Sequence, residues 1–94
     1  MKLVSIKPAT DGKHKLTAVF DNDGRTKTVH FGAKGYDDFT ITHDTEQRDR
    51  YRKRHEKDLK TNDPTKAGYL SYYTLWNKPT LAASIADYKK RFNL

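Results

Sequence analysis

The sequence predicts a single α+β domain, in which a small N-terminal antiparallel sheet is covered by two or three C-terminal helices. Three observations support this class. Residues 1–43 alternate apolar and polar side chains between short turns, which is typical of a β-meander. Residues 44–60 have a helical charge pattern, and residues 81–92 repeat apolar side chains at helical spacing. The 94 residues also correspond in number to one domain.

Three strands are expected in the first part of the chain, over Lys2–Lys7, His14–Phe20 and Thr26–Phe31. Asp21-Asn22-Asp23-Gly24 is a hairpin signal, because Asn, Asp and Gly accept the left-handed backbone angles of tight turns. The short turns between the strands predict a meander. The side chains expected on its covered face are Leu16, Ala18, Phe20 and either Val29 and Phe31 or their alternates.

The chain is expected to leave the sheet at residues 32–36, where two Gly residues permit a sharp reversal. Residues 37–42 are interpreted as a loop or a short edge strand with Phe39 and Ile41 directed inward. Neighbouring residues of an extended chain point to opposite sides, so the adjacent carboxylates of Asp37 and Asp38 do not indicate a shared catalytic task.

Residues 44–60 predict a helix that Asp44 caps, with Gln47 as its capping-box partner. Tyr51, His55 and Leu59 form a thin apolar stripe that would dock the helix on the domain. Glu56 and Asp58 are expected to pair with Arg52 and Arg54 beside the basic side. The basic side chains expected to face outward are Arg50, Lys53, Arg54, Lys57 and Lys60.

Residues 62–94 are the aromatic helical part. Asp63-Pro64 predicts the start of a short, largely buried helix, because Asp is a favoured cap and Pro a favoured first residue. Asn77-Lys78-Pro79 ends it, and Thr80 is expected to cap a last helix. That helix would lie on the sheet through Leu81, Ile85, Tyr88 and Phe92. The arc of aromatic side chains on the short helix consists of Tyr69, Tyr72, Tyr73 and Trp76.

The composition limits the possible functions. Only 34% of the residues are apolar, so the core is thin and neighbouring molecules are expected to add stability. The formal net charge of +7 favours a polyanion or an acidic protein surface as partner. The chain has no Cys, no signal-peptide pattern and no apolar run that could span a membrane. We expect no catalytic residues, metal site, cofactor or small-molecule substrate.

Two groups of residues are candidate binding sites, each with an ordinary structural alternative. The basic helix side fits a solvated surface, a protein partner or the phosphates of nucleic acid. The aromatic arc fits core packing, a protein interface or the stacking of exposed bases. The residues alone leave these alternatives open.

Three segments of the chain resemble a group of small basic proteins of large icosahedral double-stranded DNA viruses, the chloroviruses and related giant viruses. The segments are residues 30–40, residues 50–55, and residues 68–71 with 75–81 and 89–92. The resemblance implies a component of the virus particle, either a minor capsid protein that bridges capsid subunits or a DNA-associated protein. It implies capsid proteins, or DNA, as partners and the virion as location. It carries over no site residues.

Overall fold

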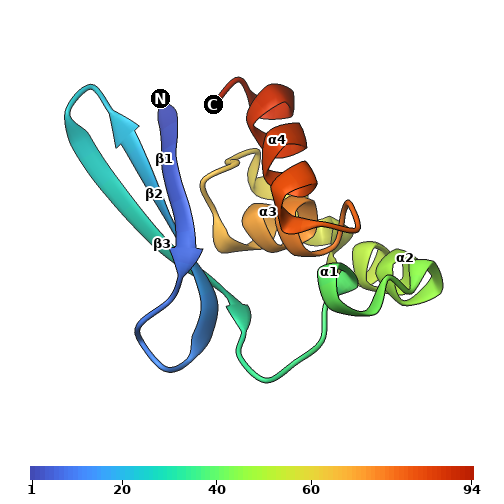
Figure 1. Cartoon of the computed structure of the whole chain (residues 1–94). Helices are drawn as coiled ribbons and strands as arrows, with labels where there is room; N and C mark the ends of the chain where they lie inside the picture. The colour runs from blue at the N-terminus through green and yellow to red at the C-terminus, as the bar shows by residue number, and fades with distance from the viewer.

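The structure is a computed structural model that describes all 94 residues, and it places a three-stranded sheet beside a group of helices (Figure 1). The sheet order is β1-β2-β3 with both pairings antiparallel, so the predicted α+β class with an N-terminal meander is confirmed. In chain order the elements are β1 (Lys2–Pro8), β2 (His14–Asn22), β3 (Arg25–Ala33), α1 (Phe39–Thr42), α2 (Thr45–His55), the 3₁₀ helix η1 (Glu56–Thr61), α3 (Ala67–Leu70), the π-helical turn η2 (Ser71–Leu75) and α4 (Leu81–Phe92).

The β2–β3 hairpin forms at the predicted turn. Asn22 pairs with Arg25, so the loop consists of Asp23 and Gly24, whose φ angles are 53° and 86°. Two left-handed residues give a turn that matches the twist of the flanking strands. The Asp21 carboxylate accepts a hydrogen bond from the Gly24 N–H at 3.0 Å, which holds the loop closed.

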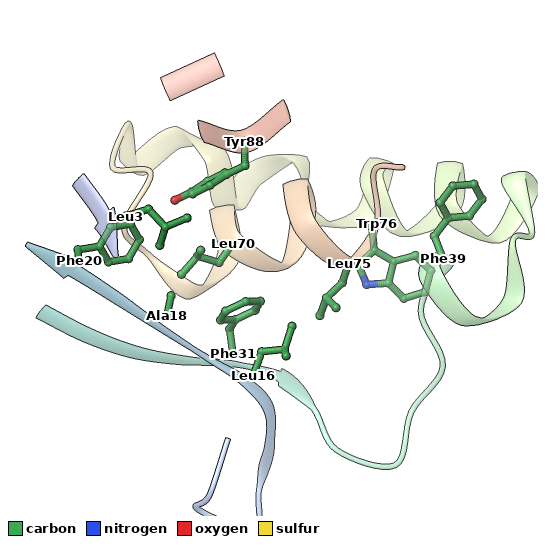
Figure 2. Packing of buried hydrophobic residues seen from close by; sticks show 10 residues of the cluster. All are labelled: Leu3, Leu16, Ala18, Phe20, Phe31, Phe39, Leu70, Leu75, Trp76 and Tyr88. Carbon is green, nitrogen blue, oxygen red and sulfur yellow. The ribbon is translucent and has the colours of Figure 1, made fainter. Parts of the chain in front are cut away.

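The hydrophobic core lies between the sheet and the helices on one face (Figures 1 and 2). The inward residues predicted for β2 are buried. Phe31 takes the inward position on β3, where it is 1% exposed and pairs with Leu16. The core cluster consists of Leu3, Leu16, Ala18, Phe20, Phe31, Phe39, Leu70, Leu75, Trp76 and Tyr88.

The prediction that the last helix lies on the sheet is wrong, because α4 packs mainly against η2. The α3–η2 segment contacts β3 instead and lies between the two. This segment is apolar nearly all round and can be covered on both sides, whereas α4 has a single apolar face. Tyr88 alone of that face is fully buried, while Leu81, Ile85 and Phe92 are partly buried. Thr80 caps α4 as predicted, accepting from the Ala83 N–H at 3.2 Å.

Residues 37–42 contain a helical turn instead of the expected loop or edge strand. The Asp38 carboxylate accepts from the Thr40 N–H at 2.9 Å and thereby caps α1. Phe39 is buried as expected, but Ile41 is 61% exposed. Residues two apart share one side of a strand but point in different directions on a helix, so the helical turn separates the two side chains.

The helix predicted for residues 44–60 is shorter in the structure, because α2 ends at His55 and the chain continues as η1. Asp44 caps α2 by accepting from the N–H groups of Glu46 and Gln47. The Gln47 side chain does not complete a capping box, since its Oε1 accepts from the Thr42 hydroxyl at 3.0 Å.

The next helix begins at Ala67 and not at Asp63-Pro64. The Asp63 carboxylate accepts from both the N–H and the hydroxyl of Thr65, at 2.9 and 2.6 Å. It therefore closes a turn of its own in place of capping a helix, as Asp side chains do in loops.

Replacing Gly32 by Ala is expected to destabilise the protein by about 2–4 kcal/mol, for two reasons. Its φ is 78°, and an added Cβ would lie 2.8 Å from Leu75 Cδ1 and 3.3 Å from Lys15 Cβ. Gly12→Ala is the matched control, because Gly12 has a φ of 75° and nothing within 4 Å of the added atom. It should lose only about 1 kcal/mol. Equal losses in urea unfolding would show that the contact with Leu75 is unimportant.

The free energy of unfolding should decrease at alkaline pH, because the buried Tyr88 hydroxyl ionises less readily in the folded state than in the unfolded chain. Burial and the nearby charge of Asp63 raise the pKa of Tyr88 above its ordinary value. A pKa raised by folding stabilises the folded state below the unfolded pKa of about 10, and this contribution is lost as the pH rises above that value.

Tyr88→Phe should cost about 1 kcal/mol at neutral pH, because the Tyr88 hydroxyl donates to the Pro64 carbonyl. The variant should also show a shallower decrease of the free energy of unfolding above about pH 10. Part of the decrease should remain, since burial also raises the pKa of Tyr51. Identical pH profiles for both proteins would show that ionisation of Tyr88 does not cause the loss of stability in alkali.

Candidate binding surface and cleft

Two arginines that the sequence analysis did not propose as a site hold α2 against the aromatic segment. Arg52 Nη1 donates to the carbonyl oxygens of Trp76 at 2.8 Å and Tyr72 at 3.3 Å. Its guanidinium carbon also lies 4.0 Å from the centre of the Tyr72 ring. Arg48 lies over the Phe39 ring and donates to the backbone carbonyl of Asn77, in the loop that follows η2. These arginines partner carbonyl groups at and beyond the end of η2, where helices leave carbonyls without internal partners.

A stack of three rings extends this contact. The Tyr51 ring lies between His55 and Trp76, with centroid distances of 4.1 and 4.2 Å and interplanar angles of 24° and 10°. Burial and the charge of Asp58 raise the pKa of Tyr51. Tyr51 and His55 are therefore the docking contacts of the predicted apolar stripe. Leu59, its third member, lies in η1 and is half-buried.

The basic residues predicted to face outward are all exposed. We define the cationic face of α2 and η1 by these side chains, which form no ion pair or side-chain hydrogen bond within the chain: Arg50, Lys53, Arg54, Lys57 and Lys60.

The expected pairs of Glu56 and Asp58 with Arg52 and Arg54 do not form. Asp58 Oδ2 lies 3.0 Å from His55 Nδ1, and the Arg52 guanidinium is turned to the backbone of the aromatic segment. Neither Glu56 nor Asp58 therefore forms an ion pair with the cationic face.

The aromatic arc predicted on the short helix packs into the domain. Tyr69, Tyr72 and Trp76 are less than 10% exposed, and Tyr73 is half-buried between the Phe92 ring and the guanidinium groups of neighbouring arginines. These rings present no open stacking surface. Core packing, one of the alternatives left open by the sequence, accounts for the arc.

A cleft of about 580 Å³ separates the end of the sheet from α2. The side chains of Leu75 and Trp76 line it, together with the backbone of Gly32. Tyr36, which is 73% exposed, and Arg54 also border the cleft. This volume is within the range of small-ligand sites. The cleft could not be predicted from the sequence, because residues far apart in the chain form it.

An ion pair lies inside the cleft. Lys15 Nζ donates to Asp38 Oδ2 at 2.6 Å, and the two side chains are 16% and 3% exposed. The other carboxylate oxygen of Asp38 caps α1. Lys15 precedes the predicted inward residue Leu16 on the strand, and Asp38 lies in a segment interpreted as a loop or a short edge strand, so nothing in the sequence indicated their contact. Asp37, in contrast, is exposed and has no partner in the chain.

The structure contains no cluster of three or more His, Asp or Glu side chains positioned to bind a metal ion. None of its helices has both the length and the apolar character needed to cross a membrane.

Residues 4–55 match a family described as a family of unknown function, DUF5754. The match covers more than half of the chain. The chain belongs to this family. The matched part includes the sheet, α1 and α2, whereas the resemblance to the virion proteins rests on segments between residues 30 and 92. No curated protein and no solved structure matches the chain. Because the function of the family is unknown, the virion assignment stays a prediction.

The docking role of Arg52 gives a direct test on one helix. Arg52→Ala should lower the free energy of unfolding by about 2 kcal/mol, because it removes charge-assisted bonds to two carbonyls. Arg50→Ala is the control and should change stability by less than about 0.5 kcal/mol, since Arg50 is exposed and unpaired. Chemical denaturation of both variants checks this. A small loss for Arg52→Ala would mean that ring stacking alone docks α2.

Proposed function

We propose that the chain is a non-enzymatic protein that binds the phosphate backbone of nucleic acid through its cationic face. The observation that supports this function most directly is the division of charge around α2. Arg48 and Arg52 dock the helix, whereas the five basic side chains of the cationic face are exposed without acidic partners. Such side chains can neutralise phosphates and release their counterions.

The binding would be independent of sequence. The cationic face consists of Lys and Arg side chains only, without the Asn and Gln residues that often read base edges. The Arg52 contact and the ring stack hold α2 against the aromatic segment, which leaves Arg50, Lys53 and Arg54 exposed on the helix. Exposed positive charges of this kind favour contacts to the phosphate backbone, which carry no sequence information.

A second candidate is a minor capsid protein that bridges capsid subunits inside a large DNA virus particle, as the resemblance implies. Both outer strands of the sheet have an unpaired edge, which is a site where other chains can add. Val4, Tyr36 and Ile41 are exposed large apolar residues of the kind found in protein interfaces. In this case the cationic face would bind an acidic surface of a capsid protein.

The first function predicts salt-sensitive retention of duplex DNA of mixed sequence. Binding in the micromolar range should weaken with salt with a log–log slope of about −3 or steeper, because several phosphates are neutralised. Replacing Arg50, Lys53, Arg54 and Lys57 together by Glu should abolish retention. Fluorescence anisotropy of a labelled duplex over a salt series measures both.

The control replaces Lys2, Lys7, Lys89 and Lys90 by Glu, four exposed lysines outside the cationic face. It changes the net charge by the same amount and should retain most of the binding. Equal loss in both variants would mean that net charge alone attracts DNA. No retention of the natural chain at about 50 mM salt would overturn the proposal and favour the protein partner.

A further inference from the structure

We infer that the cleft beside the cationic face binds the base of an unpaired nucleotide. This inference rests on the proposed function and specifies its ligand as single-stranded nucleic acid or an unpaired end. Three features carry it: the continuity of the cleft with the cationic face, the charges inside the cleft, and the polar groups of its lining that have no partner within the chain.

Arg54 belongs to both surfaces. It is exposed on the cationic face and it borders the cleft, and no carboxylate of the chain pairs with it. A phosphate bound at Arg54 would therefore lie at the mouth of the cleft. The nucleoside attached to that phosphate is the part of the ligand that can enter.

The charges in the cleft favour a neutral group over a second phosphate. Lys15 is neutralised by Asp38 at 2.6 Å, and the Asp37 carboxylate also lines the cleft without a partner. An anion would lie beside these carboxylates and would be repelled. A base is uncharged, so it can enter while its phosphates stay outside on the cationic face.

The cleft lining offers hydrogen-bond donors and acceptors of the kind that pair with the edge of a base. The Trp76 indole N–H has no partner within the chain and is not sealed from solvent, and Figure 2 shows its nitrogen turned toward Leu75, which also lines the cleft. It can donate to a ring nitrogen or carbonyl of a base. The free carboxylate of Asp37 can accept from an exocyclic amino group. Tyr36, exposed at the mouth, supplies a ring face for stacking.

A base paired within a duplex cannot reach these groups, because both of its faces are covered by stacking and its pairing edge is occupied. The cleft therefore predicts a preference for single strands over a closed duplex, in addition to the binding that the cationic face provides to both. The preference should depend on Tyr36 and Asp37, neither of which belongs to the cationic face.

The only Trp of the chain lies in the cleft and reports on its occupation. Titration with a single-stranded DNA of about 12 nucleotides should quench Trp76 fluorescence and give an affinity about tenfold tighter than for a blunt duplex hairpin of equal charge. The hairpin should bind through the cationic face without quenching. A single-stranded RNA of the same sequence, tested in parallel, shows which nucleic acid is the better source of the base.

Tyr36→Ala should reduce the single-strand affinity by about fivefold or more and leave hairpin binding unchanged. Asp37→Ala should lower the ratio of single-strand to hairpin affinity by a similar factor, because it removes a repulsive charge for both ligands and a hydrogen-bond acceptor for the base alone. Ile41→Ala is the control, because Ile41 is similarly exposed and lies outside the cleft lining. Thermal unfolding of all three variants should match the natural chain, since the replaced side chains are exposed.

The measurements distinguish failure of the cleft inference from failure of the proposed function. Equal binding of single strand and hairpin, with no change of Trp76 fluorescence, would overturn the cleft assignment and leave the cationic face as the binding surface. Absence of binding to either ligand at about 50 mM salt would overturn both. Single-strand preference that survives both cleft variants would also overturn the assignment.

Discussion

The arrangement of the helices depends on the contact between the Arg52 guanidinium and the end of η2. The backbone N–H of Trp76 donates to the Ser71 carbonyl five residues earlier. The last carbonyls of this π-helical turn have no such backbone donor and need other partners. The Arg52 guanidinium donates hydrogen bonds to the carbonyls of Tyr72 and Trp76, and it lies over the Tyr72 ring. Since no residue of α2 is fully buried, hydrophobic contact alone gives the helix little anchorage. The polar contact therefore fixes both the ring stack and the direction of the cationic face.

The sequence predicted the features that depend on near neighbours. Periodicity identified the strands and the exposed basic side chains, and local turn and cap chemistry identified the β2–β3 loop and the Thr80 cap. The same rules were ambiguous at Asp63 and Asp38, because an Asp can close a turn or cap a helix. In the structure, Asp63 closes a turn by accepting from the Thr65 N–H. Asp38 caps the helical turn α1, in which Phe39 is buried. Asp63 was predicted as a helix cap but closes a turn, whereas Asp38, which caps α1, was not predicted as a cap.

The candidate site was predictable only in part, since its components are joined by contacts between distant segments. The arginines on the two sides of α2 are chemically identical, and only the position of the aromatic segment makes Arg52 structural and Arg54 free. Strand alternation places Lys15 opposite to the inward residue Leu16, yet its side chain reaches Asp38, 23 residues further along the chain. A helix wheel assigns a side chain to a direction, whereas the partner in that direction depends on the whole fold.

The Lys15–Asp38 pair specifies a geometry more than it stabilises the fold. Removing two charges from water costs most of the energy that their attraction returns, so a buried ion pair contributes little net stability. It does require one geometry, because Asp38 simultaneously holds Lys15 from β2 and the first turn of α1. The pair thus ties the sheet to the segment that leads into α2. Two polar contacts, Lys15 with Asp38 and Arg52 with the carbonyls of Tyr72 and Trp76, therefore join the elements of a domain whose apolar core is small.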